Sequence, residues 1–348
     1  MPASRRSPET AARHASGESL PGLDPGWIPA FRNDHAPTEA KRAPSSISAN
    51  HLVRPVASPS RAALVEYAPA KVNLTLRVLG RRADGYHMIE SLVVFAGVRD
   101  RLTFVPGGES SLAVRGPHAA AAGAVADNLV LRAARCLAAE IPDLKLGRFT
   151  LIKRLPAAAG IGGGSADAAA ALRLLARANR IEIGDRRMLR AARAAGADVP
   201  VCIDPRPRLM RGVGDILSKP LVVPRLAAVL VNPGVAVPTR DVFAALHRSA
   251  LKPQPAAQAR SVPRDPEAFL AFLERRANDL EPAAIEMAPA IVKALAALRK
   301  SPGCRLARMS GSGATCFGLY DSSRTAAAAA RQLATAHPRW WVCASYLG

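Results

Sequence analysis

The sequence lacks several features that would assign it to a specialised class of protein. Its 348 residues contain no uncharged apolar run of about 18 residues, so we expect no membrane-spanning helix. The N-terminus has no continuous apolar segment of the kind found in secretory signals. The five cysteines are scattered, no pair has metal-ligand spacing, and an odd number makes a poor disulfide framework. We therefore expect reduced thiols in a cytoplasmic protein, and we assign no metal ligands.

Acidic and aromatic residues are also scarce. Lys and Arg number 48 against 27 Asp and Glu, which gives a formal net charge of +21, and aromatic residues make up 4%. Such a surplus fits anionic partners, either nucleic acid or phosphorylated small molecules, and it fits equally well a genome biased toward Arg codons. The basic residues are dispersed, with little aromatic interleaving and no recognisable nucleic-acid motif. We therefore expect no nucleic-acid partner.

The length and the order of patterns predict two domains after an N-terminal extension. Residues 1–60 are rich in Pro, Ser, Ala, Arg and Asn without periodicity, which predicts disorder; a transit peptide or a mis-assigned start site would look similar. We predict an N-terminal domain over residues 61–222 and a C-terminal domain over residues 223–348. Strands and helices are mixed without regular βαβ alternation, so the predicted fold class is α+β.

Residues 148–178 are the most informative stretch, because they predict a short strand, a glycine-rich loop and an alanine-rich helix in succession. The helix is expected to begin near Ser165. Glycine allows left-handed turns and close approach to a ligand, and a helix N-terminus offers unpaired N–H groups to a phosphate. We interpret the loop as a phosphate-binding site; the alternative is a flexible loop before a helix. The loop carries Gly160, Gly162, Gly163 and Gly164.

Two common phosphate-binding motifs each fail at one residue of this loop. A P-loop needs a lysine after its last glycine, but Gly164 is followed by Ser165. The dinucleotide fingerprint Gly-x-Gly-x-x-Gly matches at Gly160 and Gly162 but meets Ser165 in place of the third glycine. The loop therefore belongs to neither class.

A strictly alternating segment, residues 71–78, predicts a half-buried strand. Its apolar side chains are expected to face the core together: Val72, Leu74, Leu76 and Val78. The other face carries Lys71, Asn73, Thr75 and Arg77. Exposure to solvent is the usual meaning of such a polar face.

Asp198 stands in a tight turn, for which local sequence alone favours a capping role over catalysis. A helix over about residues 186–195 is expected to end at Gly196, and Pro200 is expected to prevent helix from resuming. Farther upstream, Asp127 or Asn128 is the predicted N-cap of a helix over residues 129–140.

Three segments in the right order resemble the conserved motifs of the GHMP small-molecule kinases, namely residues 69–74, 156–166 and 309–314. Further segments resemble one branch of that family, which uses ATP to phosphorylate the 2-hydroxyl of 4-diphosphocytidyl-2-C-methyl-D-erythritol in the non-mevalonate route to isoprenoid precursors. These segments are residues 82–87, 127–129, 196–200 and 211–215. The resemblance covers roughly residues 65–346.

The resemblance implies a two-domain fold with the active site in the cleft between the domains, and it implies ATP and Mg²⁺ as cofactors. Asp198 would accept the proton of the substrate hydroxyl, and Lys71 would orient Asp198 and offset phosphate charge. Residues implied to bind ATP are Pro156, Gly160, Gly162, Gly163, Gly164, Ser165 and Asn128. The loop has Ala157–Ala159 where some relatives have more glycines, and this removes no N–H donor.

The same resemblance implies a cytidine diphosphate compound as the small-molecule substrate of a monomer or homodimer. Tyr86 and His87 would recognise the cytosine, Thr239 and Phe243 would form the second wall, and Asn73 would contact the methylerythritol end. A GHMP kinase of the homoserine or mevalonate type is the alternative within enzymes, and it should lack this cytidine site. A nucleic-acid-binding protein on a retired kinase scaffold is the alternative from another class.

Overall fold

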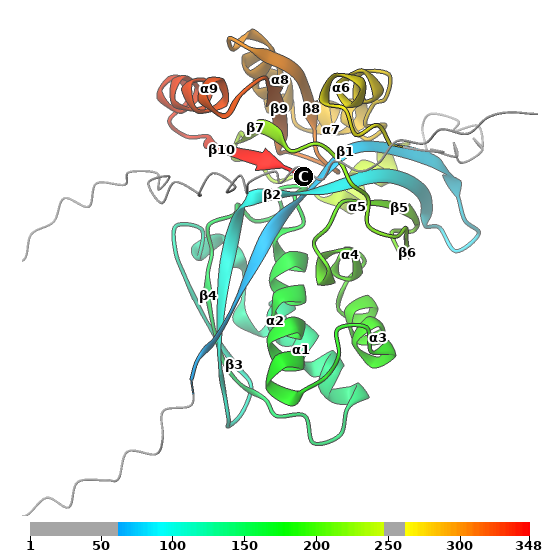
Figure 1. Ribbon diagram of the computed structural model, residues 1–348, viewed down its shortest axis with the longest axis vertical. Coiled ribbons are helices and arrows are strands. Elements are labelled where there is room, and N and C mark those ends of the chain that lie inside the picture. Colours follow the sequence, from blue (N-terminus) through cyan, green and yellow to red (C-terminus); the bar gives the residue numbers. More distant parts are fainter. Residues whose placement is uncertain (1–61, 247–261) are drawn as a thin grey trace, which may run out of the picture. The chain divides into compact units, whose positions relative to one another are not determined.

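The computed structural model describes residues 62–246 and 262–348 (Figure 1). The predicted disordered extension, residues 1–60, lies outside the described residues. The described part has an α+β fold, as predicted, in which helices cover a mixed sheet. None of the helices in these two ranges has the length and apolar character needed to span a membrane.

The strands of the described residues are β1 Leu64–Arg81, β2 His87–Pro106, β3 Ser111–Arg115, β4 Gly147–Ile152, β5 Arg208–Gly212, β6 Ile216–Leu217, β7 Leu226–Asn232, β8 Cys304–Met309, β9 Cys316–Tyr320 and β10 Trp341–Leu347. The α-helices are α1 Leu129–Glu140, α2 Gly163–Asn179, α3 Arg186–Ala195, α4 Val199–Ile203, α5 Thr239–Ala245, α6 Pro266–Glu274, α7 Glu281–Met287, α8 Ala290–Lys300 and α9 Ser323–Ala336.

The sheet follows the order β3-β4-β2-β10-β7-β9-β8, with β1 paired to β2 and with β5 paired to β2 and β6. Strands β3 and β4 run parallel, and the other pairs are antiparallel. Strands β1 and β2 form the long hairpin drawn in blue and cyan in Figure 1, against which α2 packs. The sheet is continuous through β10, which meets β2 at the pair Leu347 and Ala96.

Two clusters of buried apolar side chains stabilise this arrangement. The larger cluster contains the buried faces of α1, α2 and α3 and also buried residues of β7, α8 and α9. The smaller cluster joins part of β1 to Phe269 of α6 and Phe317 of β9. Each cluster therefore contains residues from both halves of the chain. The division into domains at residue 222 stays a prediction.

Helices with clear local signals form where the sequence predicted them. The helix over residues 129–140 is α1, and the Asn128 side chain caps it by accepting a hydrogen bond from the Val130 N–H at 3.0 Å. The helix over residues 186–195 is α3. Helix α2 begins at Gly163, two residues before the predicted start at Ser165.

The strand predicted over residues 71–78 is part of β1 and its four apolar side chains are buried, as predicted, but the expected exposure of its polar face was wrong. Lys71, Asn73 and Thr75 are only 4%, 1% and 6% exposed, so the polar face is buried as well. The four apolar residues also divide, with Val72 and Leu74 in the smaller core cluster and Leu76 and Val78 in the larger.

The physical reason is that β1 is irregular on either side of Lys71 and Asn73. The register of β1 against β2 shifts between Pro69 and Lys71 and again between Asn73 and Thr75. At the first shift β2 has two more residues than β1, and at the second β1 has one more than β2, so the regular alternation along β1 is interrupted. The side chains of Val72 and Leu74 consequently pack in a different core cluster from those of Leu76 and Val78.

The expectation that Pro200 prevents helix from resuming was also wrong. Pro200 lies in the first turn of the short helix α4, directly after Asp198. A proline is tolerated there, because the N–H that it lacks would have no partner within the helix.

Candidate active site

Lys71 and Asp198 meet although 127 positions separate them in the sequence. Lys71 Nζ lies 3.0 Å from Asp198 Oδ2, and it donates a hydrogen bond to Asn73 Oδ1 at 2.9 Å. The Lys71 side chain is 5% exposed, whereas that of Asp198 is 35% exposed. The pair therefore combines a buried cation with a carboxylate that solvent or a ligand can reach.

Asn73 is held in place by several contacts. Its side-chain Nδ2 donates to Ser91 Oγ at 2.7 Å, and its backbone N–H donates to Ser310 Oγ at 3.1 Å. Ser91 Oγ in turn donates to the Thr75 carbonyl oxygen at 2.5 Å. The bulge in β1 frees backbone groups, and polar side chains from other segments satisfy them.

The glycine-rich loop lies directly against Lys71. The Lys71 N–H donates to the Ile161 carbonyl oxygen at 2.9 Å. Gly162 has φ of +60°, and a Cβ added to it would stand 3.1 Å from Lys71 Cε. Gly160 has φ of +72°, and its added Cβ would stand 2.4 Å from the Gly313 carbonyl oxygen. Both φ angles favour glycine; at Gly160 a side chain would also clash with backbone, and at Gly162 it would press on the Lys71 side chain.

The loop leads into α2, so the first N–H groups of that helix emerge beside Lys71. These groups have no partner within the helix, and with the helix dipole they suit an anion. Gly163 and Gly164 are the first two residues of α2, and Ser165 follows in its first turn. An added Cβ on Gly164 would lie 3.3 Å from Leu129 Cδ1, so the start of α1 lies next to the start of α2. The N-cap residue Asn128, which precedes Leu129, is therefore close to this end of α2.

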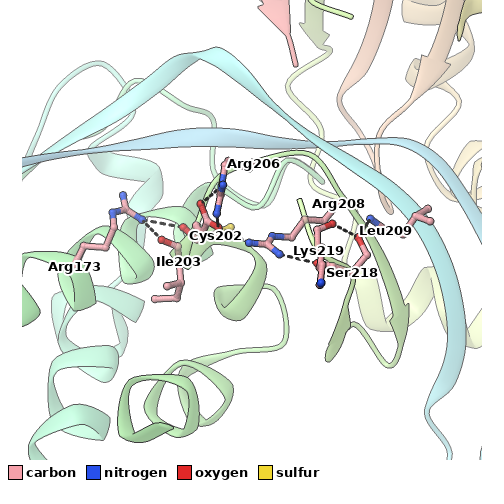
Figure 2. A network of polar contacts seen from close by, with 9 residues as sticks. Arg173, Cys202, Ile203, Arg206, Arg208, Leu209, Ser218 and Lys219 are labelled. Carbon is pink, nitrogen blue, oxygen red and sulfur yellow. Dashed lines mark hydrogen bonds and ion pairs between the residues drawn. The ribbon is translucent and has the colours of Figure 1, made fainter. Parts of the chain in front are cut away.

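Helix α4, which carries Asp198 at its N-terminus, is anchored at its other end by arginines (Figure 2). Arg173 of α2 donates to the Cys202 carbonyl oxygen at 2.9 Å. Asp204, at the C-cap of α4, pairs with Arg206 at 2.6 Å and also with Arg208. Side-chain hydrogen bonds with Arg206 lower the pKa of Asp204. These contacts fix the direction of α4 and hence of Asp198.

A second buried lysine lies beneath the start of α2. Lys153 Nζ pairs with Asp100 at 2.5 Å and with Asp167 at 2.6 Å, and all three side chains are under 5% exposed. Burial raises the pKa of Asp167 to about 7. Burial alone would lower the pKa of Lys153, but the charges of Asp167 and Asp100 outweigh it and raise that pKa. A Cβ added to Gly163 would stand 3.2 Å from Lys153 Nζ, so this cluster directly supports the loop.

Of the residues predicted to bind the cytidine, His87 and Phe243 are in direct contact. The His87 and Phe243 rings stack with centroids 5.1 Å apart and an interplanar angle of 29°. Tyr86 precedes His87 at the start of β2 and is 65% exposed. Thr239, the first residue of α5, lies 2.7 Å from Ser312 through their hydroxyl oxygens. Helix α5 thus connects the His87 ring to the loop between β8 and β9.

Comparison with known proteins identifies the family. The GHMP kinases N-terminal domain matches residues 128–204, and the GHMP kinases C-terminal domain matches residues 254–339. The 4-diphosphocytidyl-2-C-methyl-D-erythritol kinase of Xanthobacter autotrophicus is 57% identical over 280 residues, which cover 79% of this chain and 96% of that protein. The chain belongs to the 4-diphosphocytidyl-2-C-methyl-D-erythritol kinase family.

Solved structures agree with this family and with the GHMP fold. A crystal structure of 4-(cytidine 5'-diphospho)-2C-methyl-D-erythritol kinase has a TM-score of 0.67 and 36% identity, covering 82% of this chain and 99% of that chain. Homoserine kinase from Cytophaga hutchinsonii has a TM-score of 0.60 at 19% identity, covering 83% of this chain and 95% of that chain, and shares the fold alone. The comparisons thus support the cytidyl branch over the homoserine type.

Several polar residues at this kinase site were not singled out from the sequence. The sequence pattern indicates only a strand near Lys153 and an alanine-rich helix around Asp167. A charged residue in an otherwise apolar first turn of a helix indicates a partner of opposite charge, because burial of an unpaired charge is costly. Ser91 and Ser310 carried no local signal, because their partners lie on distant segments.

Proposed function

We propose that this chain transfers the γ-phosphate of ATP to the 2-hydroxyl of 4-diphosphocytidyl-2-C-methyl-D-erythritol, with Asp198 as general base. The observation that carries the proposal is the 3.0 Å ion pair of Asp198 and Lys71 beside the glycine-rich loop. A tertiary alcohol is a weak and crowded nucleophile. Its reaction therefore needs positioning, a proton acceptor and stabilisation of developing charge.

In the proposed step, Asp198 accepts the hydroxyl proton while the substrate oxygen forms a bond to the γ-phosphorus. The bond between that phosphorus and the bridging oxygen of ATP breaks, which gives the 2-phosphate and ADP. The 35% exposure of the Asp198 side chain supports release of its proton to water afterwards. Lys71 orients the Asp198 carboxylate and offsets negative charge on the transferring group.

We assign ATP binding to the glycine-rich loop and the start of α2. Gly160, Gly162, Gly163, Gly164 and Ser165 would offer backbone N–H groups to the phosphates, and the missing Cβ atoms of the glycines let this loop lie directly against Lys71. Pro156 opens the loop, and Asn128 lies toward the nucleotide. Mg²⁺, when bound with ATP, would neutralise part of the phosphate charge, and we assign it no protein ligand.

We assign recognition of the cytidyl group to Tyr86, His87, Thr239 and Phe243. An aromatic ring stacks on a base, and the polar edge of a histidine can bond to it. The contact between the His87 and Phe243 rings supports a common site for these residues. Asn73, between Lys71 and the Ser310 loop, would contact the methylerythritol end.

We propose a monomer or homodimer in the cytoplasm without a nucleic-acid partner. All five cysteines are free thiols, which agrees with a reducing compartment.

The test of the catalytic assignment is Asp198→Asn. Turnover should fall on the order of 100-fold or more, since the variant keeps the shape of the side chain but cannot accept the proton. Steady-state ADP release with the cytidyl substrate measures it. Asp185→Asn is the control, because Asp185 caps α3 outside the site and should leave turnover unchanged. Near-normal turnover of Asp198→Asn would refute the role of Asp198.

A further inference from the structure

Asn278 is a buried residue outside the predicted site, and its side chain bonds to three backbone groups. Nδ2 donates to the Met309 carbonyl oxygen at 2.9 Å and to the Gly311 carbonyl oxygen at 2.7 Å. Oδ1 accepts from the Leu280 N–H at 3.0 Å. Asn278 is only 3% exposed, so each of these bonds forms where water cannot replace it. The side chain therefore fixes the distance between its own turn and residues 309–311.

The turn that carries Asn278 is itself attached to β1, just beyond the bulge that presents Asn73. The Leu76 N–H donates to the Ala277 carbonyl oxygen at 3.0 Å, and the Asp279 N–H donates to the Leu76 carbonyl oxygen at 2.8 Å. The Asp279 carboxylate also accepts from the Val78 N–H at 2.8 Å. Asn278 thus connects β1 to the loop after β8.

That loop contacts both segments that are assigned to chemistry. Ser310 Oγ accepts from the Asn73 N–H at 3.1 Å and donates to the Gly160 carbonyl oxygen at 3.2 Å. The fit is close, since a Cβ added to Gly311 would stand 2.8 Å from the Gly160 carbonyl oxygen and 3.2 Å from Asn73 Oδ1. A displacement of the loop would therefore move Asn73 and the glycine-rich loop relative to each other.

We propose that Asn278 is a positioning residue for phosphoryl transfer. It sets the position of residues 309–311, and through Ser310 it sets the spacing between the Asn73 end of the substrate site and the phosphate-binding loop. The inference rests on the proposed function of those two segments. Rates of transfer between two bound groups depend steeply on their spacing, so a positioning residue acts on turnover more than on binding.

The test compares Asn278→Asp with a matched variant at the far end of α2. Aspartate keeps the shape of Asn278 but cannot donate to both carbonyl oxygens. Asn179 makes the same set of bonds: Nδ2 donates to the Leu175 and Lys145 carbonyl oxygens at 2.8 and 3.1 Å, and Oδ1 accepts from the Lys145 N–H at 2.7 Å. Asn179→Asp therefore controls for the loss of the same bonds where no assigned site residue is attached.

Turnover and the Kd of a non-hydrolysable ATP analogue are measured at a temperature well below the unfolding midpoint of each variant. We expect Asn278→Asp to lower kcat tenfold or more with Kd changed less than about threefold, and Asn179→Asp to keep kcat. Equal kcat losses in both variants, or none in Asn278→Asp, would overturn the inference. If Asn278→Asp does not fold, Asn278→Ser replaces it with the same criteria. An inactive wild-type enzyme would count against the proposed function instead.

Discussion

Lys71 and Lys153 are both buried lysines of the same site, and their partners give them different roles. Lys153 is enclosed by two buried carboxylates, Asp100 and Asp167, at 2.5 and 2.6 Å. Within the described ranges, Lys71 pairs with one carboxylate, that of Asp198, whose side chain is 35% exposed. The charge of Lys153 is therefore used within the protein, whereas the charge of Lys71 can act on a ligand. We assign a supporting role to Lys153 for this reason.

The buried carboxyl of Asp167 should make the free energy of unfolding depend on pH. Burial raises its pKa from the ordinary 3.8 to about 7, and its Oδ1 has no hydrogen-bond partner within the described residues. The folded state then binds this proton more tightly than the unfolded state. The resulting stability is fully present below about pH 4 and is lost as the pH rises through about 7.

Asp167→Asn lacks this titration, so its free energy of unfolding relative to wild type should rise between pH 5 and pH 8. The expected change is roughly 1–4 kcal/mol. Urea unfolding at the two pH values measures it. Asp185→Asn is the control, because a side-chain bond to Arg187 lowers the pKa of Asp185 to about 2 and it does not titrate in this range. A constant difference for Asp167→Asn would contradict the assignment.

Alanine substitution in the glycine-rich loop should affect more than backbone conformation. Gly162 and Gly108 have similar left-handed φ angles of +60° and +74°, so alanine should cost about 1–2 kcal/mol at either position. An added Cβ on Gly162 stands 3.1 Å from Lys71 Cε, while one on Gly108 has no atom within 4 Å. Gly162→Ala should therefore also displace Lys71.

We expect Gly162→Ala to lower turnover tenfold or more, because positioning of Lys71 and the phosphates is lost. Gly108→Ala should keep normal turnover. The two variants should have similar melting temperatures. Thermal unfolding and steady-state kinetics of the two variants give the comparison. Equal turnover in both would show that the loop does not need its close approach to Lys71.

Elements were predictable from the sequence where the signals are local. Asn128 and Gly196 bound two helices whose limits agree with the structure, since capping depends on the chain near the helix end. The irregular register of β1 was not predictable, because it depends on the pairing with β2. Lys71 and Asn73 are buried, although the alternating pattern predicted that they face solvent. A common site for His87 and Phe243 was expected only through the family resemblance, and their ring contact was not predicted.

At the scale of the whole molecule, the two core clusters bear on the predicted domains. Leu74 and Leu155 from the first half are fully buried with Phe269 and Phe317 from the second half. Residues 61–222 expressed alone would expose this surface. We expect this fragment to lack a cooperative urea transition, whereas residues 61–348 unfold in one transition. A sigmoidal transition of the fragment would show that the halves fold independently.

ADP release from ATP and Mg²⁺, measured with three alcohols in parallel, tests the proposed reaction itself. We expect turnover with 4-diphosphocytidyl-2-C-methyl-D-erythritol and none with homoserine or mevalonate, since only the first carries the cytidyl group assigned to His87 and Phe243. Turnover with homoserine or mevalonate, or an inert cytidyl substrate in the presence of bound ATP, would contradict the proposed reaction.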